Sequence, residues 1–315
     1  MSAGAVFRSD GDAGAAPFAG VEPLPPLSEA PQTGAGLETE GAVAPGAGSD
    51  VTVVLATLNE ARNLPRLLWE IDHYLSPKPE IVIVDDGSTD GTREYIELLA
   101  SSTPRVHPVF NVEPQTLTRA HAQGLAIAKT PFVVVMDADC QHPASAIPGL
   151  LDTLRSGYDV AVASRYVHGG SVGDRPPIRG LVSRVAGALA WTVVPGVRGL
   201  ADPLSGFYAA RRHALLRLQG VPRGFESLVF VLAGAVRLRV AEVPYCMRSR
   251  EEGESKILRG GAFLRIFLGS LLAARRRSFS PSLHPATLIS NKPQGEHSTT
   301  TSAGCPPDPS PVASS

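Results

Sequence analysis

A run of apolar residues that ends in two aspartates constrains this chain more than any other feature. Residues 132–136 read Phe-Val-Val-Val-Met, and Asp137-Ala138-Asp139 follows directly. A continuous Val-rich run bounded by polar residues is typical of a strand buried on both faces of a sheet. Side chains at i and i+2 of a strand point the same way, so we expect Asp137 and Asp139 to face one side together. Open α/β sheets bind their ligands at this carboxyl end.

Two neighbouring carboxylates suit a hard divalent cation. Mg²⁺ and Mn²⁺ prefer oxygen ligands and are usually shared with the phosphates of a bound nucleotide. Asp-x-Asp alone is short, however, and it also marks solvated strand ends and helix caps. The rest of the chain has to decide between a metal site and an ordinary strand end.

Strand and helix patterns alternate through the first half of the chain. Short apolar strand patterns are expected at 51–56, 80–84 and 106–110. Helical spacing of apolar residues follows them at 63–75, 92–99 and 118–129. This order predicts an α/β domain with a Rossmann-like, mostly parallel sheet and helices on both faces.

The second half of the chain is less regular. We expect a helix near 144–154, a strand at 158–164, and apolar helices at 181–194 and 263–274. Neither apolar helix reaches the roughly 20 residues needed to cross a bilayer. They are interpreted either as ordinary core helices or as helices on a membrane surface.

Composition divides the 315 residues into one domain and two tails. Residues 1–49 are dominated by Ala, Gly, Pro and acidic residues, and 278–315 are rich in Ser, Thr and Pro, so both are expected to be disordered. A single domain is expected at 50–277. The net charge of −1 gives no sign of a nucleic-acid-binding surface. The three cysteines are widely spaced and are expected to be reduced.

Several short motifs occur in a fixed order. The first half contains Thr57-Leu58-Asn59-Glu60, then Asp85-Asp86-Gly87-Ser88-Thr89-Asp90-Gly91, then Asp137-Ala138-Asp139-Cys140-Gln141. The second half adds Ala163-Ser164-Arg165-Tyr166, Asp202-Pro203-Leu204-Ser205-Gly206-Phe207, Glu242-Val243-Pro244 and Gly253-Glu254-Ser255-Lys256. Together they resemble family 2 glycosyltransferases of the GT-A fold, and most closely the dolichol- or polyprenol-phosphate mannosyltransferases.

The resemblance implies a role for each matched position. Asp85 or Asp86 would lie near the nucleotide base and ribose. Asp137, Asp139 and Gln141 would surround a Mg²⁺ or Mn²⁺ ion and the donor diphosphate. The other positions that it places at the substrates are Thr57, Asn59, Glu60, Arg165, Arg179, Ser183, Arg250 and Lys256. Of these, Arg165 and Arg179 are expected to share the catalytic role with Asp137 and Asp139.

The implied reaction is an inverting transfer of a hexose, mannose from GDP-mannose, onto a polyprenyl or dolichyl phosphate. The enzyme would work at the cytoplasmic face of a membrane, through peripheral contact or a membrane partner protein. A phosphate monoester has a second pKa near 6 and needs no general base to attack. The Gln-x-x-Arg-Trp signature of processive relatives is absent.

One departure from the pattern keeps alternatives open. The segment Gln115-Thr116-Leu117-Thr118 lacks the glycines that relatives carry there, and threonine does not readily take φ above zero. This loop lies near the nucleotide in the family. A UDP-sugar donor such as UDP-glucose, with a lipid-phosphate or glycan acceptor, is therefore the second hypothesis. A non-catalytic nucleotide-sugar-binding or scaffold protein is the third.

Overall fold

The computed structural model describes residues 49–173, 177–215, 227–233, 238–249 and 261–278, with the backbone alone at 177–179, 181 and 261–263. All of them belong to one compact unit. The expected tails lie outside the described residues except for Ser49 and Ser278, so their disorder stays a prediction.

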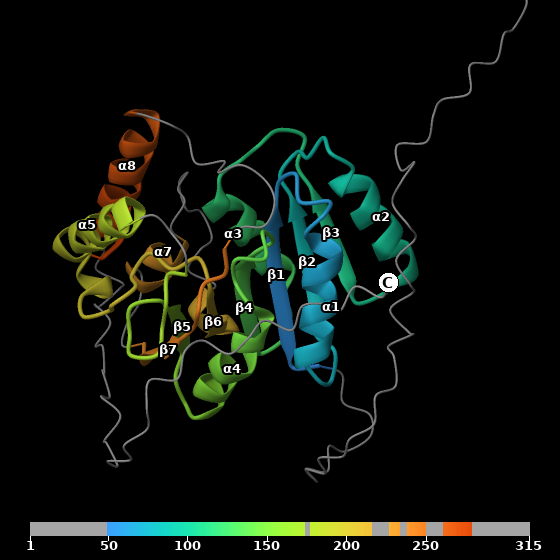
Figure 1. The fold of residues 1–315 in the computed structure, drawn as a ribbon, viewed down its shortest axis with the longest axis horizontal. Coiled ribbons are helices and arrows are strands. Elements are labelled where there is room, and N and C mark those ends of the chain that lie inside the picture. Colours follow the sequence, from blue (N-terminus) through green and yellow to red (C-terminus); the bar gives the residue numbers. More distant parts are fainter. Residues whose placement is uncertain (1–48, 174–176, 216–226, 234–237, 250–260, 279–315) are drawn as a thin grey trace, which may run out of the picture. The chain divides into compact units, whose positions relative to one another are not determined.

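A seven-stranded sheet with the order β3-β2-β1-β4-β6-β5-β7 forms the centre of this unit (Figure 1). Neighbouring strands run parallel from β3 to β4 and between β5 and β7, whereas β6 is antiparallel to both of its neighbours. The mostly parallel sheet expected from the sequence is thus present, with one reversed strand. The strands are β1 (Val51–Thr57), β2 (Glu80–Asp85), β3 (Val106–Phe110), β4 (Phe132–Asp137), β5 (Val160–Ser164), β6 (Tyr208–Arg211) and β7 (Val240–Pro244).

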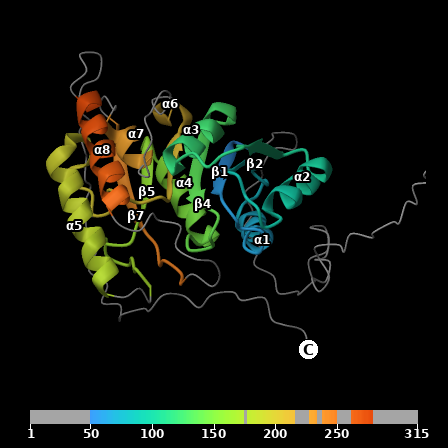
Figure 2. The same ribbon diagram turned by 90° about the horizontal axis from the view of Figure 1, so that it is seen from above.

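Helices cover both faces of the sheet (Figures 1 and 2). They are α1 (Leu64–Tyr74), α2 (Thr92–Ser102), α3 (Leu117–Ile127), α4 (Ile147–Arg155), α5 (Pro177–Val193), α6 (Arg212–Leu215), α7 (Ser227–Ala233) and α8 (Gly261–Ser278), with 3₁₀ turns η1 (Ala144–Ala146) and η2 (Pro195–Val197). Among the described residues, no helix is both long enough and apolar enough to span a bilayer.

Alternate residues of the central strands point into two separate cores. In β1, Val54 belongs to the buried cluster that includes residues of α3, α5, α7 and α8, whereas Val53 and Leu55 belong to the cluster that includes residues of α1, α2 and α4. This explains why the strand sequences are continuously apolar, because both faces are covered. Gly124 of α3 allows close helix–strand packing, since a Cβ atom there would lie 2.4 Å from Val54 Cγ1.

The strand register brings the carboxyl ends of β1, β2 and β4 to one edge. Thr57 at the end of β1 pairs with Asp85 at the end of β2, and Ala56 pairs with Asp137 at the end of β4. The aspartate pairs that the sequence singled out therefore lie at the same edge of the sheet. This edge is the usual ligand-binding edge of an open parallel sheet.

One expectation about this edge is wrong. The strand β4 ends at Asp137, so Asp139 is not part of it and strand alternation does not orient the two carboxylates. The chain bends after Asp137, and Cys140 has a left-handed φ of 58°. Asp137 and Asp139 are therefore brought into position by a turn, which i, i+2 spacing does not predict.

Candidate functional site

Asp85 anchors the turn that follows β2. Its carboxylate is fully buried and accepts hydrogen bonds from the Ser88 N–H (3.2 Å), the Ser88 hydroxyl and the Thr57 hydroxyl (3.4 Å). Each of these donors compensates part of the cost of burying a charge. Asp85 thus shapes the turn around Gly87, which has a left-handed φ of 88°.

Asn59 and Glu60 join the loop after β1 to the turn after β2. The Asn59 N–H donates to the Ser88 hydroxyl and its side-chain oxygen accepts from the Thr89 N–H, both at 2.8 Å. The Glu60 N–H donates to the Thr92 hydroxyl at 2.9 Å. These bonds join the two loops into one unit, which fixes the positions of the first two motifs relative to each other.

Asp90 forms a further contact between the same loops. Burial alone would raise the pKa of its carboxyl group. Hydrogen bonds from the Thr92 side chain and from the N–H groups of Ala61 and Thr92 outweigh this, and they hold the pKa below the ordinary value of 3.8. Asp90 therefore carries a negative charge that helps to hold the two loops together.

Asp86 holds the loop that replaces the glycines of relatives. The Gln115 N–H donates to both carboxylate oxygens of Asp86, at 2.8 and 2.9 Å, and the Asn111 side-chain amide donates at 2.9 Å. Thr116 then precedes α3 in an extended conformation, with φ −138° and ψ 155°. The loop therefore needs no residue with positive φ here, and a carboxylate fixes its course.

Asp137 lies at the end of β4 against a glycine. Its side chain is about one-third exposed (32%), and a Cβ atom on Gly206 would lie 3.3 Å from Asp137 Oδ2. The Asp137 N–H donates to His142 Nδ1 at 3.2 Å, and the His142 ring stacks on Phe207. Since Nδ1 accepts this bond, the proton of the neutral ring is on Nε2. Gly206 leaves space next to Asp137 Oδ2 that any larger residue would narrow.

Asp139 and Gln141 lie in the bend after Asp137. The Gln141 N–H donates to Asp139 Oδ1 at 3.1 Å, and both side chains are buried. Among the residues that the structure describes, no three His, Cys, Asp or Glu side chains converge on a point that could hold a metal ion. The ligands available here are oxygen atoms from only a few protein groups. This fits a Mg²⁺ or Mn²⁺ ion whose coordination shell is completed by substrate phosphates.

Gln141 is also joined to a segment far along the chain. The Arg248 N–H donates to the Gln141 carbonyl at 3.0 Å, and the Gln141 side-chain amide donates to the Arg248 carbonyl at 3.4 Å. Arg248 Nη1 in turn donates to both oxygens of the buried Glu70 at 2.8 Å. Glu70 of α1 therefore fixes the chain next to the bend that carries Asp139.

Arg165, which the resemblance places at the substrates, is already paired with a carboxylate. Its Nε and Nη2 atoms donate to the two carboxylate oxygens of Asp202, each at 2.7 Å, and both side chains are buried. Burial alone would lower the pKa of Arg165, but the bonds and charge of Asp202 raise it above its ordinary value. Glu242 accepts from the Ala201 and Asp202 N–H groups and holds this segment in place.

Arg184 is a cation that the motifs did not indicate. Tyr166 lies close to two guanidinium groups, with Arg165 at 5.3 Å and Arg184 at 5.6 Å from its ring centre. Both Tyr166 and Arg184 line two cavities, of about 190 and 530 Å³. Arg184 directly follows Ser183, which was predicted to contact the substrates, and this adjacency is the feature of the sequence that could have pointed to Arg184.

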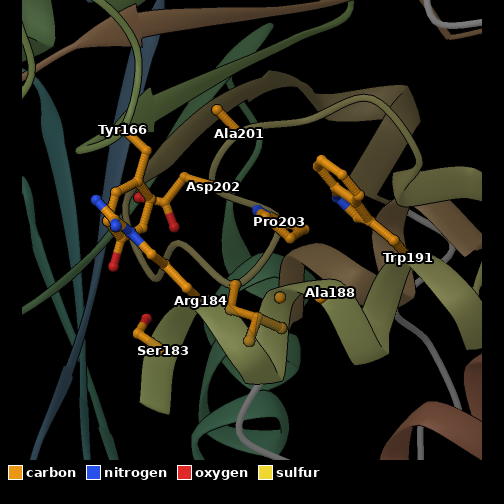
Figure 3. A pocket seen from close by; sticks show the side chains of 10 residues that line it. Tyr166, Ser183, Arg184, Ala188, Trp191, Ala201, Asp202 and Pro203 are labelled. Atoms are coloured by element: carbon orange, nitrogen blue, oxygen red, sulfur yellow. The ribbon is translucent and has the colours of Figure 1, made fainter. Parts of the chain in front are cut away.

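The smaller cavity is a groove along α5 (Figure 3). Ser183 and Arg184 lie at one end and Trp191 at the other, with Pro203 of the adjoining loop between them (Figure 3). Most of the remaining lining is apolar and consists of Gly187, Ala188, Ala201 and Leu204. Tyr166 and Asp202 complete the lining. The groove thus combines a positive, polar end with an apolar length.

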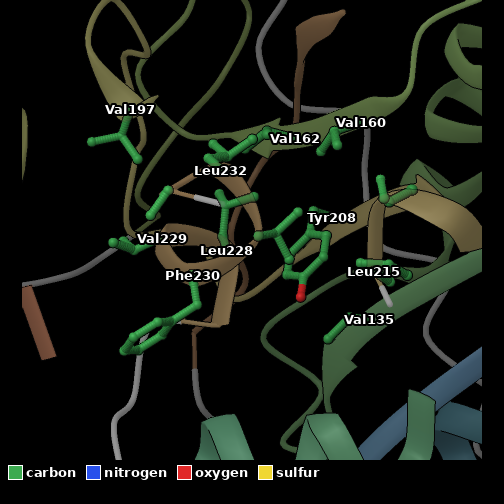
Figure 4. Close-up of a cluster of buried hydrophobic side chains, with 14 of the residues drawn as sticks. Val135, Val160, Val162, Val197, Tyr208, Leu215, Leu228, Val229, Phe230 and Leu232 are labelled. Carbon is green, nitrogen blue, oxygen red and sulfur yellow. The ribbon is translucent and has the colours of Figure 1, made fainter. Parts of the chain in front are cut away.

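Buried polar side chains lie between the sheet and helices α3 and α7. His121 Nδ1 and the Tyr208 hydroxyl each lie about 3 Å from the Ser227 hydroxyl (2.9 and 3.0 Å). Tyr208 is surrounded by Val135, Val162 and Leu228 of the apolar core (Figure 4). Burial, with a smaller contribution from His142, lowers the pKa of His121 to about 3. His121 is therefore neutral at physiological pH.

Some sequence expectations fall outside what the structure describes, and one is wrong. The Arg179 side chain, Arg250 and Lys256 lie outside the described residues, whereas Ser183 lines the groove. Cys140 is a free, buried thiol, as expected. Cys246 is disulfide-bonded, so the expectation of reduced cysteines is wrong for that residue.

Comparison with known sequences identifies a family. Residues 52–216, just over half of the chain, match the profile of Glycosyl transferase family 2. The dolichol-phosphate mannosyltransferase of Pyrococcus furiosus is 38% identical over 208 residues, which cover 66% of this chain but only 59% of that protein. The polyprenol monophosphomannose synthase of Mycolicibacterium smegmatis is 34% identical over 214 residues, which cover 65% of this chain and 80% of that protein.

Comparison with solved structures shows the same fold in glucosyl-3-phosphoglycerate synthase of Mycobacterium tuberculosis. In its complex with phosphoglyceric acid the TM-score is 0.54 at 24% identity, over 72% of this chain and 80% of that one. In its complex with Mn²⁺, UDP and glucosyl-3-phosphoglycerate the TM-score is also 0.54, at 25% identity over the same shares. The expectation of a GT-A type α/β domain is thereby confirmed.

Proposed function

Since the chain belongs to glycosyl transferase family 2, we propose that it transfers mannose from GDP-mannose onto a polyprenyl phosphate at the cytoplasmic face of a membrane. The observation that carries this proposal is the segment Ala201–Gly206. Its first residues line the groove on α5, and its last residue borders Asp137. A donor site and an amphipathic groove therefore share one short segment.

The donor occupies the carboxyl edge of the sheet in this proposal. Asp85 and Asp86 shape the turn and loop that would hold the nucleoside. Asp137, Asp139 and Gln141 would hold Mg²⁺ or Mn²⁺, and a bound ion supplies charge neutralisation for the departing diphosphate. Mannose as the transferred sugar is supported by the names of relatives, which include a mannosyltransferase and a monophosphomannose synthase.

The acceptor occupies the groove. The Arg184 guanidinium is exposed and would contact the acceptor phosphate, together with Ser183 and with the expected Arg179, Arg250 and Lys256. The apolar length toward Trp191 would take the first isoprenoid units. Arg165 acts here as a positioning residue, because Asp202 already balances its charge.

No general base is required for this reaction. A phosphate oxygen attacks the anomeric carbon, the bond from that carbon to the nucleoside diphosphate breaks, and its electron pair leaves with the diphosphate. The acceptor phosphate is largely a dianion at neutral pH and has no proton to lose. Arg184 would hold the acceptor phosphate in place while one of its anionic oxygens forms the new bond to the anomeric carbon.

The direct test is incubation with radiolabelled GDP-mannose, Mg²⁺ or Mn²⁺ and polyprenyl phosphate. The full chain should form a lipid-extractable product. Asp139→Asn should abolish it, and Asp152→Asn, at an exposed aspartate of α4, should not. Absence of product from the wild-type chain with either metal would contradict the proposal.

A UDP-sugar donor remains the second candidate. The solved structures with this fold include complexes with Mn²⁺ and UDP-glucose, and the loop at 115–118 departs from the mannosyltransferase pattern. A ligand that binds only the native state raises its apparent stability with occupancy. Thermal shifts with GDP-mannose and UDP-glucose, each with Mn²⁺, separate the two, and a shift with UDP-glucose alone would favour the second candidate.

A further inference from the structure

Two neighbouring helices carry most of the exposed large apolar side chains. Helices α5 and α8 contact each other and lie side by side at one edge of the domain in both views (Figures 1 and 2). Of the nine large hydrophobic side chains exposed among the described residues, six lie on these helices: Val182, Val185, Trp191, Leu264, Leu268 and Leu272. We refer to these six as the α5–α8 apolar face.

The apolar side chains of α8 form a stripe. Leu264, Leu268 and Leu272 are four positions apart, so they lie on one side of the helix, and they are 55%, 38% and 55% exposed. Phe267, Leu271 and Ala274, on the adjoining side of the helix, are buried in the core. Core packing therefore covers only part of the apolar surface of α8, and the stripe of leucines is left exposed.

Charge on the same helices has a single sign. Helix α5 contains two arginines and α8 contains four, and neither contains an aspartate or glutamate. Arg184, Arg265, Arg275 and Arg276 are exposed. Over the whole chain acidic and basic residues nearly balance, with a net charge of −1, so this concentration of arginine is local.

We propose that the α5–α8 apolar face docks on an anionic lipid surface. Leucine and valine side chains would enter the boundary between headgroups and acyl chains, and the arginines would contact the acidic headgroups. An acidic protein groove would match the charge, but it would not need an apolar face on two adjoining helices. The proposal deepens the membrane contact of the proposed function, and it makes a membrane partner unnecessary for binding.

Trp191 connects the α5–α8 apolar face to the groove proposed for the acceptor. It belongs to the α5–α8 apolar face and also lines the end of the groove away from Arg184. Docking through this face would bring the apolar end of the groove to the lipid surface. A membrane-embedded isoprenoid could then enter the groove without leaving an apolar environment.

The test uses the full chain carrying Trp69→Phe, so that Trp191 is the remaining tryptophan. Vesicles of phosphatidylcholine alone are compared with vesicles that also contain phosphatidylglycerol. The anionic vesicles should shift Trp191 emission to the blue and float the protein, with binding roughly tenfold or more tighter than to neutral vesicles and weakened by salt. The double change Leu268→Glu with Leu272→Glu should weaken this binding about tenfold or more. Leu98→Glu, at an exposed leucine of α2, should leave it unchanged.

This experiment tests membrane docking independently of the proposed transfer reaction. Vesicle binding needs neither donor nor acceptor, and the leucine variants should retain transfer to a short-chain, water-soluble polyprenyl phosphate. Equal binding to both vesicle types would overturn the role of lipid charge. No binding to either, or equal loss with Leu98→Glu, would overturn the proposed surface and favour a membrane partner protein.

Discussion

Arg165 and Asp202 form a buried two-point ion pair, with both N···O distances at 2.7 Å. The Arg165 N–H donates to the same carboxylate at 3.1 Å, and Glu242 accepts from the Asp202 N–H at 2.9 Å. The pair therefore joins the end of β5 to the segment that separates the groove from Asp137. This links the fold of the second half to the geometry of both proposed substrate sites.

Arg165→Gln is expected to destabilise the protein. It leaves the Asp202 carboxylate buried without its cation, which costs about 3 kcal/mol or more of unfolding free energy. Arg93→Gln is the matched control, because Arg93 and Glu97 form an exposed pair whose loss costs less than about 1 kcal/mol. Urea denaturation of the two variants measures the difference. Equal, small effects would contradict a structural role for Arg165.

Arg184→Gln is expected to affect acceptor binding and leave stability unchanged. Arg184 is exposed, and a lost charge-assisted hydrogen bond to phosphate is worth about 1.5–3 kcal/mol. The KM for polyprenyl phosphate should rise by about tenfold or more, with the KM for GDP-mannose little changed. Steady-state kinetics with each substrate varied in turn test this. An unchanged acceptor KM would exclude Arg184 from the phosphate site.

Gly206→Ala is expected to weaken metal binding. The new methyl group would lie 3.3 Å from Asp137 Oδ2 and narrow the space next to it. Calorimetric titration of Mn²⁺ in the presence of GDP should show a weaker apparent affinity. Gly269→Ala is the control, since a Cβ atom there meets nothing within 4 Å. Unchanged Mn²⁺ affinity in Gly206→Ala would remove Asp137 Oδ2 from the proposed metal site.

Acid is expected to destabilise the fold through His121. Burial lowers its pKa from 6.5 to about 3, so the unfolded chain binds a proton more readily than the folded chain. The contribution of His121 is fully present above pH 6.5 and is lost as the pH falls toward 3, by up to about 1.4 kcal/mol per pH unit. Denaturation midpoints between pH 7 and 5 should fall less steeply for His121→Gln than for the wild type or for His213→Gln, at an exposed histidine. Parallel slopes for all three would contradict this account.

The first half of the fold follows closely from local sequence signals. The strands expected at 51–56, 80–84 and 106–110 were found within one residue, because each is apolar and pairs with parallel neighbours through regular crossover helices. β6 and α7 were not predicted. β6 has only four residues, and its position depends on antiparallel pairing with β4 and β5, which lie far away in the sequence.

The sequence predicted which residues belong to the candidate site better than it predicted the contacts that they make. The motifs located the aspartates at the sheet edge, since strand ends determine that position. The turn that orients Asp139 depends on the left-handed φ of Cys140. Arg165 forms its ion pair with Asp202, which lies 37 residues further along the chain. Arg184 was missed because its position beside Tyr166 arises only from packing of α5 against the 201–204 loop.

In the proposed reaction the acceptor supplies its own charged nucleophile, and this can be tested by comparing a lipid phosphate with the matching lipid alcohol. The enzyme is given radiolabelled GDP-mannose, Mg²⁺ or Mn²⁺ and either a polyprenyl phosphate or the polyprenyl alcohol of the same chain length. A labelled, acid-labile lipid should form with the phosphate, and none should form with the alcohol. Label transfer to the alcohol, or to neither lipid, would contradict the proposed reaction.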